Sequence, residues 1–580
     1  MQGIQVAPEK IEFAALGPGV IVMPGKQSGR KALHMTGEAV TRASEAYSYP
    51  LTIRELLTSG VRRARDQEIV YADKRRLSYP ELEERVARLA SALAGLGVHR
   101  GHTVAMMDWD SNRYLECFFA VPMMGAVLHT VNVRLTAEQV LYTINHAPDD
   151  VILFNAEFLP LLQEIWDRVV PGKRLVLMSD DGAAATGALP IAGEYEALLA
   201  AADPGYAFPA LDENTRATTF YTTGTTGLPK GVYFTHRQLA LHTLAATSAL
   251  AGNGQGCFND DDVYMPITPM FHVHAWGVQY VATMRAAKQV YPGRYVPDTL
   301  LGLIEREKVT FSHCVPTLLE MVLAGAKRRS VNLSGWKVII GGASLPQAVA
   351  AQALDAGLDV FAGYGMSETC PILTISRLLP EMADWSRDRQ IEVRCRAGRP
   401  VGLVQIRTVD DAMNDVPRDG VSVGEIVVRA PWLTHGYLHD QASSEKLWAG
   451  GWLHTGDIGM IGPDGYLKIT DRLKDVIKTG GEWVSSVELE DMLLQMPQIA
   501  EAAVIGIPDP KWSERPLAIV VLRPDDTVET EQVRTHLMGF VSRGLLSKFG
   551  VPERVIVTDD IPKTSVGKID KKLLRRLYGA

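Results

Sequence analysis

The chain has 580 residues, a formal net charge of −8 and five cysteines. Its length allows roughly three to four domain-sized units, and the acidic balance argues against nucleic acid as the default partner. The cysteines are scattered and form no Cys-x-x-Cys pair, which argues against a disulfide scaffold or a zinc site and favours a reducing compartment. We expect a cytoplasmic protein without a signal peptide, and its most apolar stretch, residues 117–128, is too short to span a bilayer.

The first 50 residues are rich in glycine and proline, and we predict an irregular N-terminal extension there. After them, Leu82, Val86, Leu89 and Leu93 lie at helical spacing, and Gly97 is typical of a helix end. Further strands are predicted at 103–107, 127–131, 151–154 and 175–178, further helices from 112 and at 136–144, and a connection at 179–210. Strands that alternate with helices indicate a doubly wound parallel sheet.

A loop rich in threonine and glycine follows a strand predicted at 217–221 and precedes a helix predicted from residue 237. Residues 222–231 contain four threonines, three glycines and Lys230. Glycine lets successive backbone N–H groups point into one concavity, and the hydroxyls and the lysine add donors and positive charge. A flexible surface loop is the alternative, but this composition favours a polyphosphate. The common nucleotide loop is excluded because proline precedes the lysine and glycine follows it.

The next segment that suggests a binding role is the mostly apolar stretch 264–277. His272 and His274 stand two apart within it, as metal ligands on a strand can. No third residue of fitting type is nearby, so a structural histidine is the simpler interpretation than a metal site. Trp276, from the residues alone, is an aromatic side chain in an apolar stretch.

Two glycine-rich turns follow apolar strands. Gly341-Gly342-Ala343-Ser344 follows the strand predicted at 338–340, and Gly363-Tyr364-Gly365 ends the one predicted from 360. In the second of these turns, glycine would allow close approach of the backbone to a flat base, on which Tyr364 would stack. Glu368, a little further on, can hold Mg²⁺ through a carboxylate oxygen, although a solvated glutamate is the ordinary alternative.

The last motifs are acidic and basic. Asp457 is suited to accept hydrogen bonds from both ribose hydroxyls, with an ordinary turn aspartate as the alternative. A charged run, 471–478, separates two apolar segments and leads into a smaller α+β region of ordinary domain size. That region ends in an exposed-type loop, 561–570, with Lys568 at its tip.

Taken in this order, the five motifs resemble those of AMP-forming adenylating enzymes: acyl-CoA synthetases, peptide-synthetase adenylation domains and luciferases. The resemblance covers about residues 50–580 and is greatest to medium- and long-chain fatty acyl-CoA synthetases, on segments 269–276, 480–490 and 509–516. It implies an α/β fold with a large N-terminal domain of doubly wound sheets, a small β-barrel-like part and a small mobile α+β domain. The implied boundaries are an extension at 1–50, the large domain at 51–470, a hinge at 471–475 and the small domain at 476–580.

The resemblance also implies the roles of single residues. Lys568, His272 and Glu368 would be catalytic, Thr222 and Glu368 would hold the metal, His272 and Trp276 would line the acyl pocket with Trp276 as its gate, and Lys474 would be the hinge. The ATP- or AMP-binding residues would be Thr222, Thr223, Gly224, Thr225, Thr226, Lys230, Gly342, Ala343, Gly363, Tyr364, Gly365, Met366, Ser367, Asp457 and Arg472. The CoA-binding residues would be Lys478, Gly480, Gly481, Glu482 and Trp483.

The activity implied by the resemblance is ATP-dependent acyl-CoA synthesis through an acyl-adenylate, with Mg²⁺ and CoA and with a fatty acid as substrate. A homodimer is compatible with it. Three alternatives stay open: a ligase for an aromatic, alicyclic or short sulfur-containing acid, an enzyme that loads a carrier protein, and a nucleotide-binding regulatory protein. Lys568, Glu368 and Lys230 are all present, which argues against the last.

Overall fold

In the computed structural model, the described residues are 41, 43–180, 189–222, 228–252, 254–479, 482–564 and 568–579. The side chains of Glu482 and Trp483 are outside this description. The chain divides into two units, residues 1–49 and residues 50–580. The architecture that follows is that of the second unit.

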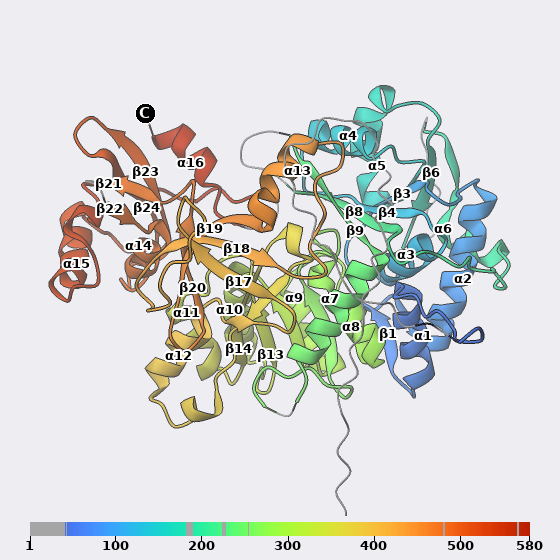
Figure 1. Ribbon diagram of the computed structural model, residues 1–580, viewed down its shortest axis with the longest axis horizontal. Coiled ribbons are helices and arrows are strands. Elements are labelled where there is room, and N and C mark those ends of the chain that lie inside the picture. Colours follow the sequence, from blue (N-terminus) through green and yellow to red (C-terminus); the bar gives the residue numbers. More distant parts are fainter. Residues whose placement is uncertain are drawn as a thin grey trace, which may run out of the picture. The chain divides into compact units, whose positions relative to one another are not determined.

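A seven-stranded sheet forms the first layer of this unit (Figure 1). Its strands are β3 (Thr103–Met107), β4 (Val127–Thr130), β5 (Val151–Asn155), β6 (Arg174–Met178), β7 (Ile191–Glu194), β8 (Arg216–Thr222) and β9 (Lys230–Thr235). Their order is β7-β6-β5-β3-β4-β8-β9, and all neighbours are parallel except β8 and β9. The pairing of β8 with β9 therefore holds the two ends of the threonine-glycine loop next to each other.

The second large sheet has nine strands. They are β1 (Glu68–Tyr71), β2 (Arg75–Ser78), β10 (Val263–Ile267), β11 (Lys288–Tyr291), β12 (Phe311–Cys314), β13 (Lys337–Ile340), β14 (Asp359–Gly365), β15 (Ile372–Ile375) and β16 (Arg399–Pro400). In the order β16-β15-β14-β13-β12-β10-β11-β1-β2, the strands from β14 to β1 are parallel. Ligands of such sheets bind beyond the carboxyl ends of the strands, and the motifs of this part of the chain follow β10, β13 and β14.

Helices cover both sheets, and several begin where the sequence supplies a cap. Ser78 and Glu81 form a capping box at the start of α2, and Thr235 and Gln238 form one at α7. The α-helices of this part are α1 (Ile53–Arg63), α2 (Tyr79–Gly95), α3 (Asn112–Met123), α4 (Ala137–His146), α5 (Leu159–Ile165), α6 (Tyr195–Ala201), α7 (His236–Ala249), α8 (Val278–Arg285), α9 (Pro297–Glu307), α10 (Pro316–Arg329), α11 (Gln347–Asp355), α12 (Arg387–Cys395) and α13 (Gln441–Leu447). Short 3₁₀ turns are η1 (Ala156–Phe158), η2 (Trp166–Arg168), η3 (Ala275–Gly277), η4 (Ser367–Thr369), η5 (Pro380–Met382) and η6 (Ala449–Gly451).

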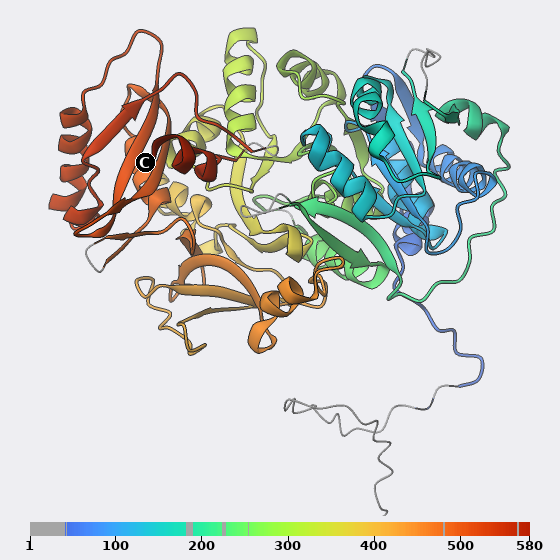
Figure 2. The same cartoon turned by 90° about the horizontal axis from the view of Figure 1, so that it is seen from above.

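Two smaller sheets complete the unit. An antiparallel sheet contains β17 (Gln405–Val409), β18 (Gly424–Arg429), β19 (Leu453–Ile461) and β20 (Leu467–Arg472) in chain order. The C-terminal region contains β21 (Ile477–Thr479), β22 (Glu482–Val484), β23 (Ile499–Asp509), β24 (Ser513–Leu522), β25 (Arg554–Val557), α14 (Ser486–Leu493), α15 (Thr530–Ser542), α16 (Lys571–Tyr578) and η7 (Lys548–Gly550). Figure 2 shows these red elements gathered around their own sheet, and they enclose their own apolar core.

The predicted fold class is confirmed: parallel sheets form the large part, and a smaller α+β region follows. Two local predictions were wrong. Residues 179–210 are not only a connection, because they contain β7, which extends the edge of the first sheet, and the helix α6. The sequence prediction also placed no strand between the threonine-glycine loop and the following helix, where β9 pairs with β8. In the described part of the chain all five cysteines are free thiols, and no helix has the length and apolarity needed to cross a membrane.

Candidate active site

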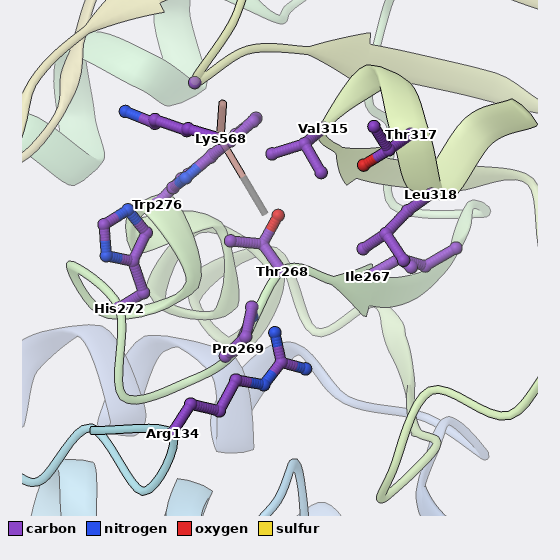
Figure 3. A pocket seen from close by; sticks show the side chains of 11 residues that line it. Arg134, Ile267, Thr268, Pro269, His272, Trp276, Val315, Thr317, Leu318 and Lys568 are labelled. Atoms are coloured by element: carbon purple, nitrogen blue, oxygen red, sulfur yellow. The ribbon is translucent and has the colours of Figure 1, made fainter. Parts of the chain in front are cut away.

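A small cavity of about 70 Å³ lies beyond the carboxyl ends of β10, β12 and β13 (Figure 3). It is lined by Arg134, Ile267, Thr268, Pro269, His272, Trp276, Val315, Thr317, Leu318, Gly342 and Lys568. Most of these come from the loops that follow the three strands, whereas Lys568 comes from the C-terminal region. The structure thus brings together four of the predicted site residues, Lys568, His272, Trp276 and Gly342, although they are far apart in the sequence.

The wall of this cavity has an unusual backbone. Residues 273–277 all have positive φ angles, from 42° at Val273 to 71° at Gly277. A non-glycine residue in that region costs about 1 to 3 kcal/mol and persists only where the surroundings hold it. Here His274 is buried with its Nε2 2.8 Å from the Thr218 hydroxyl, and Trp276 stacks on the His313 ring at a centroid distance of 4.9 Å. These buried contacts fix the position of Trp276 beside the cavity.

His272 and Lys568 present one neutral and one cationic group to the cavity. Burial, assisted by the charges of Lys568 and Arg134, lowers the pKa of His272 to about 3, so its imidazole is neutral. Burial, followed by the repulsion of Arg472, lowers the pKa of Lys568 to about 8, while Asp457 and Glu368 oppose this shift. At neutral pH the lysine is therefore a cation close to its titration range. A neutral histidine is suited to donate or accept a hydrogen bond at a bound carboxylate.

Asp457 is the centre of a second group of site residues. Its Oδ1 lies 3.3 Å from Nε of Arg472, and its Oδ2 accepts a hydrogen bond of 2.8 Å from the Tyr364 hydroxyl. Asp457 and Arg472 stand opposite each other in the pairing of β19 with β20. Asp457 lies within β19 rather than at a strand end, and it is buried. A hydrogen-bonded buried carboxylate at this place can accept further hydrogen bonds from hydroxyl groups.

Glu368 and Lys230 belong to a third group. The Glu368 carboxylate is buried, and its Oε1 accepts a 2.7 Å hydrogen bond from the Tyr437 hydroxyl. The Lys230 ammonium lies 4.6 Å from the centre of the Tyr437 ring and donates to Ser443 Oγ at 2.7 Å. Burial raises the pKa of Glu368, and the Tyr437 hydrogen bond opposes that rise.

Glu368 and Thr222 are the residues predicted to hold a metal ion. Among the described residues there is no group of three or more His, Cys, Asp or Glu that could hold a metal. Mg²⁺, however, is usually held by one or two carboxylates together with substrate phosphates. Glu368 offers such a carboxylate, oriented through one oxygen, and Thr222 ends β8 directly opposite Lys230. These residues therefore fit a magnesium ion that arrives with a nucleotide.

The remaining predicted residues lie as follows. Gly342 has a φ of +77° and lies next to Lys568 and Trp276, so an added Cβ would lie 3.4 Å from the lysine Cε. Ala343 is exposed in the same turn, and Gly363, Gly365, Met366 and Ser367 lie partly buried at the end of β14 and in η4. Lys474 lies in the turn between β20 and β21.

Some predictions fall outside these contacts. Thr223, Gly224, Thr225, Thr226, Gly480 and Gly481 lie outside the described residues. Lys478 lies on β21, which pairs with β22, Glu482–Val484. The predicted CoA residues that are described thus belong to a separate hairpin and are not among the residues that line the cavity.

Sequence reasoning missed several residues of the site, among them Arg134 and Tyr437. Arg134 lines the cavity, and Tyr437 contacts both Glu368 and Lys230. Arg134 follows the apolar strand β4 by four residues, so a basic residue after the carboxyl end of a strand was a usable signal. Tyr437 follows a glycine in a loop, and no local pattern connects it with residues that are 69 and 207 positions away.

The sequence matches known proteins over most of its length. Residues 57–438 match the family described as AMP-binding enzyme, and residues 488–568 match the AMP-binding enzyme C-terminal domain. The chain is 40% identical to a long-chain-fatty-acid–CoA ligase from Thermus thermophilus, over 87% of this chain and 90% of that protein. It is 38% identical to a 3-methylmercaptopropionyl-CoA ligase from Ruegeria lacuscaerulensis, over 91% of this chain and 97% of that protein.

A solved structure supports the same relationship. The crystal structure of an anthranilate CoA ligase in complex with anthranoyl-AMP aligns with a TM-score of 0.80 and 25% identity, over 91% of this chain and 98% of that one. The family match covers more than half of the chain, and the cavity, the Asp457 group and the Glu368 group lie within the matched parts or beside them. The chain therefore belongs to the AMP-binding enzyme family and, within it, to the adenylate-forming acyl-CoA ligases.

Proposed function

We propose that this ligase activates a medium- or long-chain fatty acid with ATP and transfers the acyl group to CoA. The observation that carries the proposal is the meeting of Lys568, from the C-terminal region, with His272 and Trp276 of the large part around one cavity. The T. thermophilus relative, a long-chain-fatty-acid–CoA ligase, supports the choice of acid. In this proposal the cavity is the entrance of the acyl pocket, and Trp276 closes the pocket beyond it.

In the first step a carboxylate oxygen of the acid attacks the α-phosphorus of ATP, and the bond to pyrophosphate breaks. Two anions at about 4 Å repel by about 4 kcal/mol at an effective dielectric constant near 20. Lys568, as a cation, bridges the carboxylate and the α-phosphate and offsets this repulsion. Bound Mg²⁺ supplies further neutralisation of the phosphate charge. His272 orients the carboxylate. Because its imidazole is neutral, it does not offset the negative charge with which the carboxylate attacks.

Asp457 and Arg472 hold the ribose in this proposal, and the turn at Gly342 and Ala343 holds the base together with Tyr364. The threonine-glycine loop, through its backbone, its hydroxyls and Lys230, holds the β- and γ-phosphates. All these groups orient the α-phosphorus for attack, which is the main contribution a protein makes to such a transfer.

In the second step the CoA thiol attacks the acyl carbonyl carbon, and AMP leaves with the electron pair of the broken bond. Lys568 belongs to the C-terminal region and lines the cavity. We propose that this region rotates about Lys474 and so withdraws Lys568 from the cavity. The rotation would bring the hairpin of Lys478 and Trp483 to the site. The domain boundaries given above, with a hinge at 471–475, are part of this proposal.

A short sulfur-containing acid is the second candidate, since the cavity is small and a relative from R. lacuscaerulensis is a 3-methylmercaptopropionyl-CoA ligase. The test is CoA-dependent AMP formation with straight-chain acids of 2 to about 18 carbons, 3-methylmercaptopropionate, benzoate and cyclohexanecarboxylate. A maximum at medium or long chains supports the first proposal. A maximum at the sulfur-containing acid, or at a ring acid, replaces it with that substrate class.

Two further expectations belong to the proposal. The five free thiols are typical of a reducing compartment, which supports a cytoplasmic location. A homodimer stays a prediction, and light scattering of the purified protein would test it.

A further inference from the structure

Tyr437 joins two parts of the site that adjoin different sheets, Lys230 on β9 and Glu368 in η4 after β14. Its hydroxyl donates a 2.7 Å hydrogen bond to Oε1 of Glu368. The face of the same ring lies 4.6 Å below the Lys230 ammonium. The Tyr437 hydroxyl therefore contacts Glu368, the proposed metal ligand, and the face of its ring contacts Lys230, the lysine proposed to bind phosphate.

The backbone around Tyr437 is fixed to the same two places. The amide of Thr434 donates to the carbonyl of Glu368 at 2.9 Å, and the amide of Leu438 donates to the carbonyl of Gly231 at 2.8 Å. Tyr437 itself forms a β-bridge with Val232 of β9, and its amide donates to Ser444 Oγ at 2.8 Å. The segment 434–438 thus ties η4 to β9, and the Tyr437 side chain has little freedom to point elsewhere.

The two contacts of Tyr437 differ in kind. A carboxylate that accepts one hydrogen bond through Oε1 keeps Oε2 for another ligand and is held in one rotamer. The Lys230 ammonium has a second partner, Ser443 Oγ at 2.7 Å, and Asp440 lies 3.9 Å away. The hydroxyl is therefore the more important contact for Glu368, while the ring is one of several supports for Lys230.

We propose that Tyr437 is a positioning residue: its hydroxyl orients Glu368 for the metal that accompanies ATP, and its ring holds Lys230 at the phosphates. Residues that hydrogen-bond a metal ligand typically change metal affinity by about 10- to 100-fold when they are removed. The inference rests on the proposed role of Glu368 as the metal ligand. Tyr437 is not among the residues that line the cavity with Lys568 and His272, so its role is to position other side chains.

The two contacts can be separated by two substitutions. Tyr437→Phe removes the hydroxyl and keeps the ring, whereas Tyr437→Leu removes both. The readout is the dissociation constant of Mn²⁺, as a probe for Mg²⁺, measured by electron paramagnetic resonance with a non-hydrolysable ATP analogue bound. We expect Tyr437→Phe to weaken Mn²⁺ binding about tenfold or more. It should not change the affinity for the ATP analogue that is measured with a metal chelator present. Tyr437→Leu should in addition weaken this metal-free binding of the analogue by about threefold, because a cation–π contact is lost.

Tyr466→Phe is the matched control. The Tyr466 hydroxyl is also buried against the chain, where it donates to the carbonyl of Arg377, but it lies outside this group. The Tyr466→Phe substitution should leave the dissociation constants of Mn²⁺ and of the ATP analogue unchanged. Equal Mn²⁺ affinities of Tyr437→Phe and the control would overturn the positioning role, as would a loss of analogue affinity in chelator caused by Tyr437→Phe.

Glu368→Gln separates the inference from the function on which it rests. If this variant binds Mn²⁺ like the wild type, Glu368 is not the metal ligand, and the proposed roles of Glu368 and of Tyr437 both fail. If Glu368→Gln weakens Mn²⁺ and Tyr437→Phe does not, only the role of Tyr437 fails. Melting curves of all variants show whether each one is folded, so that a loss of binding is not confused with a loss of structure.

Discussion

Arg472 and Asp457 stand opposite each other on β20 and β19, with Nε 3.3 Å from Oδ1. Arg472 is the last residue of β20 and lies within the proposed hinge, 471–475. The charges of both residues also act on Lys568, since Arg472 lowers its pKa and Asp457 raises it. The proposed ribose site, the hinge and the proposed catalytic lysine are thus electrostatically linked, so that changes at one should be measurable at another.

The ribose role of Asp457 predicts a specific loss of nucleotide discrimination. Asp457→Asn keeps the size of the side chain but removes the charge that strengthens its hydrogen bonds, about 1.5 to 3 kcal/mol for a charged partner. We expect the wild type to bind ATP about 10- to 100-fold more tightly than 2′,3′-dideoxy-ATP, and the variant to lose most of this difference. Calorimetric titration of both nucleotides gives the two ratios. An unchanged ratio in Asp457→Asn would place the ribose elsewhere.

Lys568 should matter for one half of the reaction only. In Lys568→Ala the bridge between carboxylate and α-phosphate is absent, so acid-dependent release of pyrophosphate should fall by about 100-fold or more. Formation of the thioester from synthetic acyl-adenylate and CoA should stay within about threefold of wild type, because Lys568 has left the site by then. The two half-reactions are followed separately, by pyrophosphate release and by thioester absorbance. Equal losses in both would argue against the two-conformation mechanism.

The pH dependence of the first half-reaction follows from the same lysine. Its ordinary pKa of 10.5 is lowered to about 8 in the fold, so the cation is complete below that pH and is lost as pH rises through it. The kcat/KM for adenylation, which reports the free enzyme, should therefore be level at neutral pH and decline above about pH 8. In Lys568→Arg this decline should vanish, because arginine stays protonated, even if the maximal rate is lower. A decline that persists in the arginine variant belongs to another group.

The fold was largely predictable because its signals are local. Apolar runs of strand length placed β3, β13 and β14 correctly, and the carboxyl edge that the neighbours β13 and β14 share is a property of any parallel sheet. The strand β9 was missed because its residues adjoin a motif that was interpreted as loop and helix. It becomes a strand through its pairing with β8, which is a tertiary contact.

The site was predictable only where a motif carried it. His272, Gly342 and Lys568 were expected from the family resemblance, and the structure places them around one cavity. Tyr437 carries no such motif, since its role depends on contacts with residues far away in the chain. The roles assigned to Thr223–Thr226, Gly480 and Gly481 remain predictions.

Trp276 should control which acids fit. It is 6% exposed, it stacks on His313, and its ring would meet a Cβ at Gly341 at 2.9 Å, so it fills the space beside the turn after β13. Trp276→Ala should shift the chain-length preference by four or more carbons, at roughly 0.8 kcal/mol per additional buried methylene. The dissociation constant of ATP should stay within about twofold. The same acid panel, with ATP titrations alongside, checks both. A changed ATP affinity with an unaltered acyl profile would contradict the gate.

If Lys474 is the hinge, a substitution there that hinders rotation should slow thioester formation more than pyrophosphate release, which is the reverse of the result expected for Lys568→Ala. Several contacts join β20 to the start of α14 in this conformation. Asp471 Oδ2 accepts from the amide and the hydroxyl of Ser486 at 2.6 Å each, the Ser485 hydroxyl donates to the carbonyl of Thr470, and Lys468 lies 2.7 Å from Glu488. Rotation about Lys474 must rearrange them. Proline fixes its own φ and restricts the residue before it, so Lys474→Pro should hinder the rotation.

In the conformation described here Lys568 is already in the cavity, and this conformation is the one that the first half-reaction needs. Lys474→Pro should therefore keep acid-dependent pyrophosphate release within about tenfold of wild type and slow thioester formation from synthetic acyl-adenylate by about 100-fold or more. Lys474→Ala, which removes the side chain without fixing the backbone, is the control and should affect both steps alike. If Lys474→Pro instead slows pyrophosphate release more than thioester formation, the turn between β20 and β21 does not act as the hinge between the two steps.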